Sequence, residues 1–475
     1  MRITIKTLLF LLISVTGIAQ QKSSTPNIVL IFMDDMGYGD LSCYGALDIN
    51  TPNIDQLASE GIRFTNFLSS QAVCSASRAS IMTGCYANRV GISGALFPGS
   101  KVGLASNEMT MAELLKQKNY ATAIYGKWHL GDAKQFLPLQ QGFDEYLGIP
   151  YSNDMWPVTY DGKPADSSSN KSKVPQLPLI KNNDKWIEIK TLEDQSTLTE
   201  RYTTAAEAFI KKNKNKPFFL YLPHSMPHVP INASPAFRGK SKQGLYGDVI
   251  QEIDASVGRI LKTIKENGLD NNTIVIFTSD NGAPGYIGLP DLNKPYRGWK
   301  LTHFEGGVHV PFIVSYPNKI SKGKTYKGRV SNLDIFSTVA SVAGVDMTRN
   351  DLKDIAFDGA NLIPYLSGEN EGEPERILFN KSGDYSFLIK EGWKLQVDLV
   401  QNKKWLYNLN EDPTEQLNLS ESNFTKLNEL EEILNNKLSE QVKPIWLSLL
   451  DWPIFIDKTL DDKVNKNDEY IFWAN

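Results

Sequence analysis

The sequence predicts an α/β fold: a large, doubly wound and mostly parallel sheet flanked by helices, with a smaller C-terminal antiparallel-sheet subdomain. Three observations lead to this prediction. Continuous apolar runs rich in β-branched residues recur along the chain and are typical of strands buried on both faces of a parallel sheet. Helical patterns separate these runs. After about residue 370 the runs become short and fall at hairpin spacing.

The strands of the large sheet are predicted from five apolar runs, at residues 27–33, 121–125, 217–222, 273–277 and 310–315. Thr110-Met-Ala-Glu113 has the form of a capping box and predicts the start of a short helix. A longer helix is predicted where apolar residues repeat with helical spacing, at positions 249, 253, 257, 260 and 264. We expect these helices to pack on the sheet.

The C-terminal segment follows a different pattern. Short strands are predicted at residues 376–379, 385–389, 393–397 and 405–407, followed by a polar helix near 423–440. We therefore expect three parts: a signal peptide at residues 1–19, a large α/β domain at 20–369 and an antiparallel β subdomain with a helix at 370–475.

The first twenty residues have the form of a secretory signal. Arg2 and Lys6 precede an apolar stretch, and Gly17-Ile-Ala19 places small residues before Gln20. The stretch is too short to span a bilayer, and no later run is long enough, so we expect no membrane span. The mature protein is expected to be exported, either to the periplasm or to the outside of the cell.

Composition narrows the class of protein. Of the 475 residues, 41% are hydrophobic and 22% are charged, which excludes a disordered chain and a multi-span membrane protein. Lysine and arginine number 50 against 54 acidic residues, a net charge of −4. This balance lacks the basic excess of nucleic-acid-binding proteins, so no nucleic-acid partner is expected.

Acidic and amide side chains follow two of the predicted strands. Asp34-Asp35 follow the first strand, and Asp280-Asn281 follow the run that ends at Phe277. Each pair by itself is typical of a turn or a helix cap. Ligand sites of open α/β sheets, however, lie at the carboxyl ends of the strands. Four oxygen-bearing side chains without imidazole or thiolate favour Ca²⁺ or Mg²⁺ over Zn²⁺, and one hard cation is expected.

All five histidines are predicted to lie in loops after apolar runs, at positions 129, 224, 228, 303 and 309. Single histidines are usually structural, but such clustering favours a functional role for some of them. His129 and His228 are the best candidates, because His129 lies just beyond a strand and His228 is flanked by stiffening prolines. His224 and His303 are left as structural or substrate-facing residues.

The chain has three cysteines, which is too few for a disulfide framework. Cys43 and Cys85 are expected to be buried free thiols, with a bond between them as the alternative. Cys74 opens the segment Cys74-Ser-Ala-Ser-Arg78, and if this segment is helical, Arg78 stands one turn beyond Cys74. From this pattern alone, Cys74 is either a thiolate nucleophile or a packed helix residue.

Five motifs occur together over roughly residues 26–320: Asp34-Asp35, Cys74-x-Ala76-x-Arg78, Gly126-Lys-Trp-His129, Ser279-Asp-Asn-Gly282 and Lys300-x-Thr302-x-x-Glu305-Gly-Gly307. In this order they resemble the type I, formylglycine-dependent sulfatase family, the arylsulfatase-like branch of the alkaline phosphatase superfamily. The resemblance implies that a maturation enzyme oxidises Cys74 to Cα-formylglycine. The hydrated aldehyde then supplies the oxygen that attacks sulfur.

The resemblance also implies a role for each matching residue. One Ca²⁺ would be bound by the modified residue 74 together with Asp34, Asp35, Asp280 and Asn281. Arg78 and Lys127 would hold the hydrated aldehyde, and His129 would take a proton from its second hydroxyl. His228 would protonate the leaving oxygen, and Lys300 would contact the sulfate. Ser152, in Tyr151-Ser-Asn-Asp154, matches a segment that touches sulfate in some arylsulfatases; its alternative is a turn hydroxyl.

Two positions depart from the family pattern. Ala76 stands where proline is more frequent, so the extent of Cys74 conversion depends on the maturation enzyme. His309 stands where arginine is usual, so the role of that arginine does not carry over.

The resulting prediction is a secreted sulfatase acting on a sulfated carbohydrate, a polysaccharide or its oligosaccharides, by family analogy. Trp128, Trp156 and Trp299 lie near the motifs and are candidates to stack on sugar rings, with packing in the interior as the alternative. One alternative is a phosphomonoesterase or phosphodiesterase of the same superfamily, which usually holds two transition metals with several histidines. The other is a non-catalytic carbohydrate-binding protein, which would require Cys74 to stay a thiol.

Overall fold

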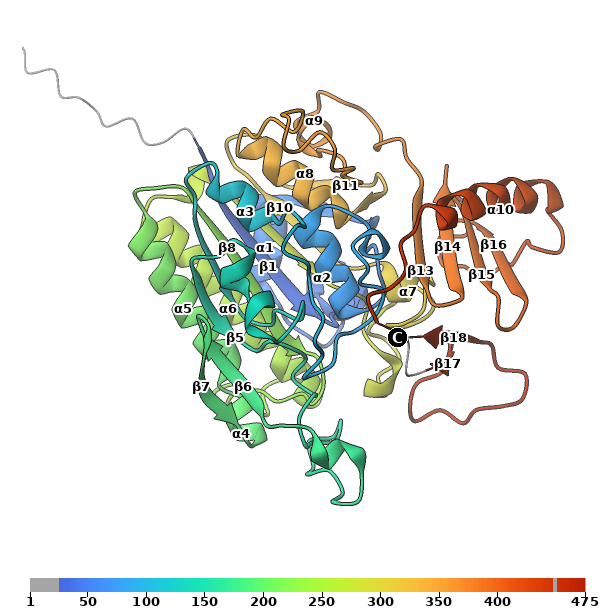
Figure 1. Cartoon of the computed structure of the whole chain (residues 1–475), viewed down its shortest axis with the longest axis horizontal. Helices are drawn as coiled ribbons and strands as arrows, with labels where there is room; N and C mark the ends of the chain where they lie inside the picture. Colours follow the sequence, from blue (N-terminus) through green and yellow to red (C-terminus); the bar gives the residue numbers. More distant parts are fainter. Residues whose placement is uncertain (1–24, 447–450, 475) are drawn as a thin grey trace, which may run out of the picture.

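A ten-stranded sheet lies at the centre of the larger part of the molecule (Figure 1). The structure is a computed structural model and describes residues 25–446 and 451–474, so the predicted signal peptide lies outside the described residues. The strand order is β11-β2-β10-β9-β1-β8-β4-β5-β6-β7. Strands distant in sequence are neighbours in this order, as expected for a doubly wound sheet.

The four middle strands are parallel and entirely buried. β1 (Asn27–Asp34) pairs with β8 (Phe218–Pro227) on one side and with β9 (Thr273–Ser279) on the other, and β4 (Ala121–Tyr125) pairs with β8. All four were predicted from apolar runs, and burial on both faces is the reason the runs are continuous. β8 continues to Pro227, beyond its predicted end at residue 222.

The edges of the sheet are mixed. On one side, β10 (Phe312–Ser315) is antiparallel to both β9 and β2 (Ile62–Phe64), and β11 (Lys324–Tyr326) completes this edge. On the other side, β5 (Glu145–Gly148) is parallel to β4, whereas β6 (Leu177–Lys181) and β7 (Asp184–Ile189) are antiparallel. Two short strands, β3 (Phe67–Leu68) and β12 (Val330–Ser331), form a separate pair. The predicted fold, large and mostly parallel, is confirmed.

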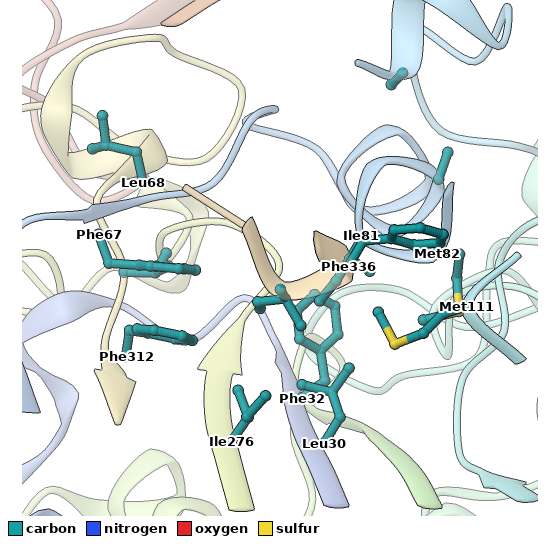
Figure 2. Close-up of a cluster of buried hydrophobic side chains, with 14 of the residues drawn as sticks. Leu30, Phe32, Phe67, Leu68, Ile81, Met82, Met111, Ile276, Phe312 and Phe336 are labelled. Atoms are coloured by element: carbon teal, nitrogen blue, oxygen red, sulfur yellow. The ribbon is translucent and has the colours of Figure 1, made fainter. Parts of the chain in front are cut away.

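Helices cover both faces of the sheet (Figure 1). Alternate residues of β1 enter two cores: Val29 and Ile31 pack with α1 (Pro52–Glu60), α5 (Leu198–Asn213) and α6 (Gly244–Glu266). Leu30 and Phe32 pack on the opposite face with α2 (Cys74–Thr83), α3 (Met111–Lys116) and α8 (Leu333–Val342). Figure 2 shows this second cluster, with Leu30, Phe32 and Ile276 beneath Phe336 and Met111. The remaining short helices are α4 (Leu192–Gln195), α7 (Glu305–Val308) and α9 (Ile363–Ser367).

Both helix predictions are confirmed. Thr110 Oγ1 accepts a hydrogen bond from the Glu113 backbone N–H at 3.1 Å, and Glu113 Oε2 accepts one from the Thr110 N–H at 2.9 Å. This reciprocal capping box satisfies two donors that the first turn of α3 leaves free. In α6, all five residues of the predicted apolar stripe are buried in the core. Among the described residues, no helix is both long enough and apolar enough to span a bilayer.

The C-terminal part forms a four-stranded antiparallel sheet with the order β13-β14-β15-β16. Its strands are β13 (Leu378–Ser382), β14 (Tyr385–Lys390), β15 (Trp393–Asp398) and β16 (Lys403–Asn408). α10 (Phe424–Ser439) lies against this sheet (Figure 1), and its leucines pack in the core between them. These strands and the helix agree with the prediction, whereas the ribbon of β17 (Asp451–Phe455) and β18 (Tyr470–Ala474) was not predicted. The boundary at residues 369 and 370 stays a prediction.

A buried ionic cluster joins this small sheet to the large part of the molecule. Lys394 Nζ on β15 lies 2.8 Å from Glu305 Oε1 at the start of α7 and 3.0 Å from Glu415 Oε1. Glu415 Oε2 also accepts a hydrogen bond from the Glu305 backbone N–H at 2.6 Å. Burial alone would raise the pKa of Glu305, but Lys394 holds it below its usual value. One ammonium group therefore compensates two buried carboxyl groups.

We expect Lys394→Met to lower the free energy of unfolding by about 3–5 kcal/mol, because it leaves the two buried carboxyl groups without their cation. Burial already raises the pKa of Glu415 to about 7 despite Lys394. A raised folded-state pKa means that stability falls as the pH rises, so the loss should be larger at about pH 8 than at about pH 6. Urea unfolding followed by circular dichroism measures both effects.

Lys404→Met is the matched control for this measurement. Lys404, on the neighbouring strand β16, pairs with Glu431 at a partly exposed position. The loss of such a pair should cost less than about 1 kcal/mol. Equal destabilisation by the two variants would contradict the assigned importance of the buried cluster.

Candidate active site

The carboxyl ends of the middle strands bring the predicted acidic residues together. β1 ends at Asp34, and its parallel partner β9 is followed by Asp280 and Asn281. The Asp35 backbone N–H donates to Asp280 Oδ1 at 3.1 Å, and Asn281 Nδ2 donates to Asp35 Oδ1 at 2.7 Å. All four side chains are fully buried. The contacts follow from the parallel pairing, which places two strand ends side by side.

Cys74 faces this acidic cluster from the first turn of α2, which begins at that residue. One turn later, Arg78 Nη2 lies 2.8 Å from Asp280 Oδ2 and 3.4 Å from Asp34 Oδ1. Arg78 Nη1 donates to the Lys127 carbonyl at 3.0 Å. The predicted helical spacing of Cys74 and Arg78 is therefore present, and it places a buried guanidinium against two carboxylates.

The segment after β4 brings Lys127 to the same place. Its Nζ donates to Asp34 Oδ2 at 2.6 Å and to Ser152 Oγ at 3.1 Å. Gly126 makes this approach possible: it has a φ of 142°, and a Cβ there would lie 1.8 Å from the Pro223 carbonyl oxygen. The Lys127 N–H donates to that same carbonyl at 2.8 Å. Only glycine fits where the chain passes so close to β8.

His129 and His228 are both buried and both neutral at pH 7. His129 Nε2 lies 2.9 Å from the Leu96 carbonyl and therefore carries the proton, which leaves Nδ1 without a hydrogen bond among the described residues. Burial lowers the pKa of His129 well below its usual value, and the positive charges of Lys127 and Arg78 lower it further. Burial also lowers the pKa of His228, and the positive charge of Lys300 adds to this effect.

His228 presents Nε2 to the site. Its Nδ1 lies 2.7 Å from the Val229 carbonyl, so Nδ1 carries the proton. Nε2 lies 3.3 Å from Ser152 Oγ and 3.5 Å from Asp35 Oδ2. Ser152 therefore bridges Lys127 and His228 in the interior, a placement more specific than the turn hydroxyl that was its alternative.

Lys300 closes the opposite side of the cluster. Its Nζ donates to Asp35 Oδ2 at 2.8 Å and to the Tyr286 hydroxyl at 3.3 Å. Burial alone would lower the pKa of Lys300, but Asp35 raises it well above its usual value, so the ammonium is charged. The C-terminal subdomain positions the segment that follows, because Tyr385 and Glu415 accept hydrogen bonds from the backbone N–H groups of His303 and Glu305.

Three residues of the site have a left-handed backbone without being glycine. The φ angles are 66° at Asp35, 60° at His129 and 76° at Leu301, next to Lys300. Such conformations cost free energy and persist where the surrounding structure enforces them, which occurs frequently at functional sites. The three positions lie at the ends of different segments that meet around Cys74.

The donor atoms fit a hard cation. Ligand atoms of Asp34, Asp35, Cys74 and His228 lie within 4.8 Å of one another. Within the described residues, Asp34 Oδ1 and Asn281 Oδ1 are buried and accept no hydrogen bond, although Arg78 Nη2 forms an ion pair with Asp34 Oδ1 at 3.4 Å. Burial and the neighbouring Asp34 raise the pKa of Asp280. Orphaned oxygens and a carboxyl group driven toward neutrality are what a bound divalent ion would relieve, and oxygen ligands favour Ca²⁺ or Mg²⁺.

The geometry weighs against Cys74 as a thiolate nucleophile. Burial, only partly offset by Lys127 and Lys300, raises the pKa of the Cys74 thiol to about 12. A thiol with this pKa is protonated at neutral pH and is a poor nucleophile. Cys43 and Cys85 are also free thiols, Cys85 buried and Cys43 only partly buried, and they do not pair.

The other three histidines lie outside the site, and the prediction that all five are in loops is wrong. His224 lies within β8, 3.1 Å from Ser256 Oγ, because this strand runs further than its apolar pattern. His303 stacks on Tyr385 of the small sheet. His309 lies 2.9 Å from Glu305 Oε2 and 3.0 Å from the Thr65 carbonyl, a structural position.

Of the two roles left open for the tryptophans, stacking on a ligand or packing in the interior, burial favours packing. Trp128, Trp156 and Trp299 are 0%, 4% and 7% exposed. Their rings fill the interior, and a ring without an exposed face has none to offer a ligand. The aromatic residues at the site are instead Tyr286 and its neighbour Tyr160, which sequence reasoning missed. The one sequence feature that could have indicated them is their position, because each follows a motif by several residues.

Comparison of the sequence and of the fold with known proteins identifies one family. A family model described as Sulfatase matches residues 26–345. Arylsulfatase A of Homo sapiens is 37% identical over 375 residues, which cover 75% of this chain and 71% of that protein. N-acetylgalactosamine-6-sulfatase of Canis lupus familiaris is 38% identical over 409 residues, covering 81% of this chain and 74% of that protein. The crystal structure of Ps i-CgsB in complex with k-i-k-neocarrahexaose has a TM-score of 0.76, with 29% identity and coverage of 89% of this chain and 94% of that one.

Proposed function

The chain belongs to the sulfatase family and is a sulfuric ester hydrolase, and from this premise we propose that its substrates are sulfate esters of a carbohydrate. The observation that carries the proposal is that Lys127, Lys300, Ser152 and His228 are linked around the acidic cluster that Cys74 faces. Support for a carbohydrate comes from the relatives. One is named for a sulfated amino sugar, and a structural neighbour was crystallised with an oligosaccharide.

Residue 74 and the acidic cluster would carry the two groups that complete the site. An aldehyde hydrate at residue 74 would supply the hydroxyl that attacks sulfur, and a calcium ion held by Asp34, Asp35, Asp280, Asn281 and residue 74 would draw charge from the sulfate oxygens. The inert thiol and the two orphaned oxygens are the support for this part of the proposal.

Lys127 holds the hydrated aldehyde at residue 74, and Lys300 contacts the sulfate. Both ammonium groups lie in the interior, each against one aspartate of the cluster. Their charges attract the anionic ester and stabilise the charge that develops on its oxygens during transfer. Ser152 Oγ lies between Lys127 and His228 and is placed to donate to a further sulfate oxygen.

His228 supplies the proton for the leaving sugar oxygen. In the substrate-free protein Nε2 is unprotonated and faces Ser152. A bound sulfate adds negative charge beside the ring, which raises the pKa of His228 and favours protonation of Nε2. That proton then passes to the ester oxygen as the bond to sulfur breaks.

His129 acts in the second half of the reaction. Its Nδ1 is unprotonated and makes no hydrogen bond within the described part of the chain. We assign it as the base that takes a proton from residue 74, because this nitrogen has its lone pair available for a proton. Arg78 holds the first turn of α2 against the acidic cluster while this occurs.

We also propose that the protein is exported and is matured by a formylglycine-generating enzyme. The support is the signal-like segment at residues 1–19 and the Cys74-x-Ala76-x-Arg78 motif. Both are sequence patterns.

We expect the purified, matured protein to release inorganic sulfate from at least one defined sulfated saccharide. The measurement is ion chromatography of reactions with a panel of sulfated mono- and oligosaccharides, each with its phosphorylated counterpart as control. Preference for the phosphate ester would favour the phosphatase alternative. Binding of sulfated sugars without any release by fully matured protein would favour the non-catalytic alternative.

A further inference from the structure

Two tyrosines form an aromatic wall that leads outward from the site. The rings of Tyr160 and Tyr286 are stacked, with centroids 5.2 Å apart and planes 9° apart. The Tyr286 hydroxyl donates to Asp35 Oδ2 at 3.4 Å and accepts from Lys300 Nζ at 3.3 Å. Tyr160 is 53% exposed. The pair therefore extends from the sulfate-binding lysine to solvent.

Asp154 lies within electrostatic range of this wall. It follows Ser152 by two residues, and its charge acts on both tyrosine hydroxyls. Burial favours the neutral form, but His228, Lys171 and Lys300 lower the pKa of Asp154, so the group is a carboxylate. Its Oδ1 is buried and accepts no hydrogen bond from the described residues. A buried carboxylate oxygen without a donor is costly unless a ligand or water supplies one.

The loop around Asp154 is itself well held. Lys171 Nζ donates to the Asp154 carbonyl at 2.6 Å, which ties the later part of the loop to this residue. Asn153 Nδ2 donates to the His228 carbonyl at 3.0 Å, which fixes the loop to the segment after β8. Asp154 is therefore positioned relative to His228, the proposed proton donor.

We propose that Tyr160, Tyr286 and Asp154 form the subsite for the sugar ring that carries the sulfate. The ring rests an apolar face against the tyrosine wall, and a free hydroxyl next to the ester donates a hydrogen bond to Asp154. This inference rests on the proposed carbohydrate function. Sugars suit such a site because their C–H faces pack on aromatic rings while their hydroxyls reach a few placed polar groups.

The carboxylate also defines what the subsite rejects. A second sulfate on the neighbouring carbon would replace a donor by an anion and set it against Asp154. The subsite therefore selects a monosulfated position with a free neighbouring hydroxyl over a vicinal disulfate. Removing only that hydroxyl should reduce kcat/KM about 10- to 100-fold, the range for a hydrogen bond to a charged group.

The test compares three substrates: a monosulfated sugar on which the wild type is active, its analogue lacking the neighbouring hydroxyl, and the vicinal disulfate. Wild-type kcat/KM should be higher for the monosulfated sugar than for either of the other two substrates. Asp154→Ala should remove the preference for the hydroxyl. Asp154→Asn keeps an acceptor without the charge, so it should retain that preference and turn over the disulfate at least about tenfold faster than wild type does.

Tyr160→Ala tests the wall. We expect its KM for the monosulfated sugar to rise about tenfold with a smaller change in kcat, since the ring contact is made equally before and during reaction. Trp186→Ala is the matched control, because Trp186 is 50% exposed on β7, where its ring packs with Lys181 and Arg201. It should leave KM and kcat unchanged.

The outcomes separate the subsite from the proposed function. If the wild type desulfates the sugar but the Asp154 and Tyr160 variants keep its selectivity and KM, the subsite is overturned and the carbohydrate function stands. If the wild type releases sulfate from no sugar, the carbohydrate function fails and the subsite fails with it. A wild type that prefers the vicinal disulfate overturns the role of Asp154.

Discussion

Cys74→Ala should abolish sulfate release, with a loss in kcat of at least about a thousandfold, while the protein remains folded. The expected size follows from removing the reacting group itself, which costs more than the loss of any supporting contact. The fold should survive because Cys74 is the first residue of α2, where alanine is a good helix former and the lost side chain is small. Sulfate release and circular dichroism measure the two effects.

Cys43→Ala is the control for this variant, because Cys43 is also a free thiol and lies outside the site. It should keep full activity. The same preparation of wild type allows a direct check of the modification. Mass spectrometry of the peptide containing residue 74 should show the thiol replaced by an aldehyde. Fully active protein with an unmodified Cys74 would refute the proposed mechanism.

Asp280→Asn should remove the bound calcium ion and reduce kcat by at least about a hundredfold. Asp280 is central, since one of its oxygens accepts from Arg78 and the other accepts from the Asp35 backbone N–H. Asparagine has nearly the same shape but carries no charge, so the cavity loses one of its three carboxyl groups without losing its packing. Calcium per chain, counted by elemental analysis, measures the first effect independently of activity.

The metal prediction has two further checks. Asp270→Asn, which changes an exposed aspartate before β9, should leave both calcium content and rate unchanged. Wild type treated with a chelator should lose activity and regain it on addition of Ca²⁺. An unchanged rate in protein shown to be free of divalent ions would contradict the assignment, as would a pair of transition-metal ions in the active protein.

Much of the site was predictable because parallel strands end at the same edge of a sheet. Asp34-Asp35 and Asp280-Asn281 are far apart in sequence, yet each follows a buried apolar run, and the pairing of β1 with β9 joins them. The spacing of Cys74 and Arg78 was predictable because a helix places residues four apart on one face. Gly126 and Lys127 were predictable only as parts of a motif.

Other predictions were wrong because the sequence pattern around a residue does not determine whether its side chain is buried. His224 was expected in a loop, but β8 continues past its last apolar residue, and there the buried imidazole contacts Ser256. The three tryptophans near the motifs were candidates either to stack on a ligand or to pack inside, and the core buries them. A large aromatic residue carries the same sequence signal whether its ring fills the interior or faces a ligand.

The sequence by itself determined the family, the mostly parallel fold, the small C-terminal sheet and the residues that surround Cys74, because periodicity and motif spacing are local properties of the chain. Only the tertiary structure decided which groups come into contact: that Ser152 joins Lys127 to His228, that Lys394 compensates Glu305 and Glu415, and that Tyr160 stacks on Tyr286. These contacts join segments separated by many residues. The pKa shifts, the buried oxygens without donors and the exposed rings arise from burial and from charges brought close in space. The local order of residues determines neither of these.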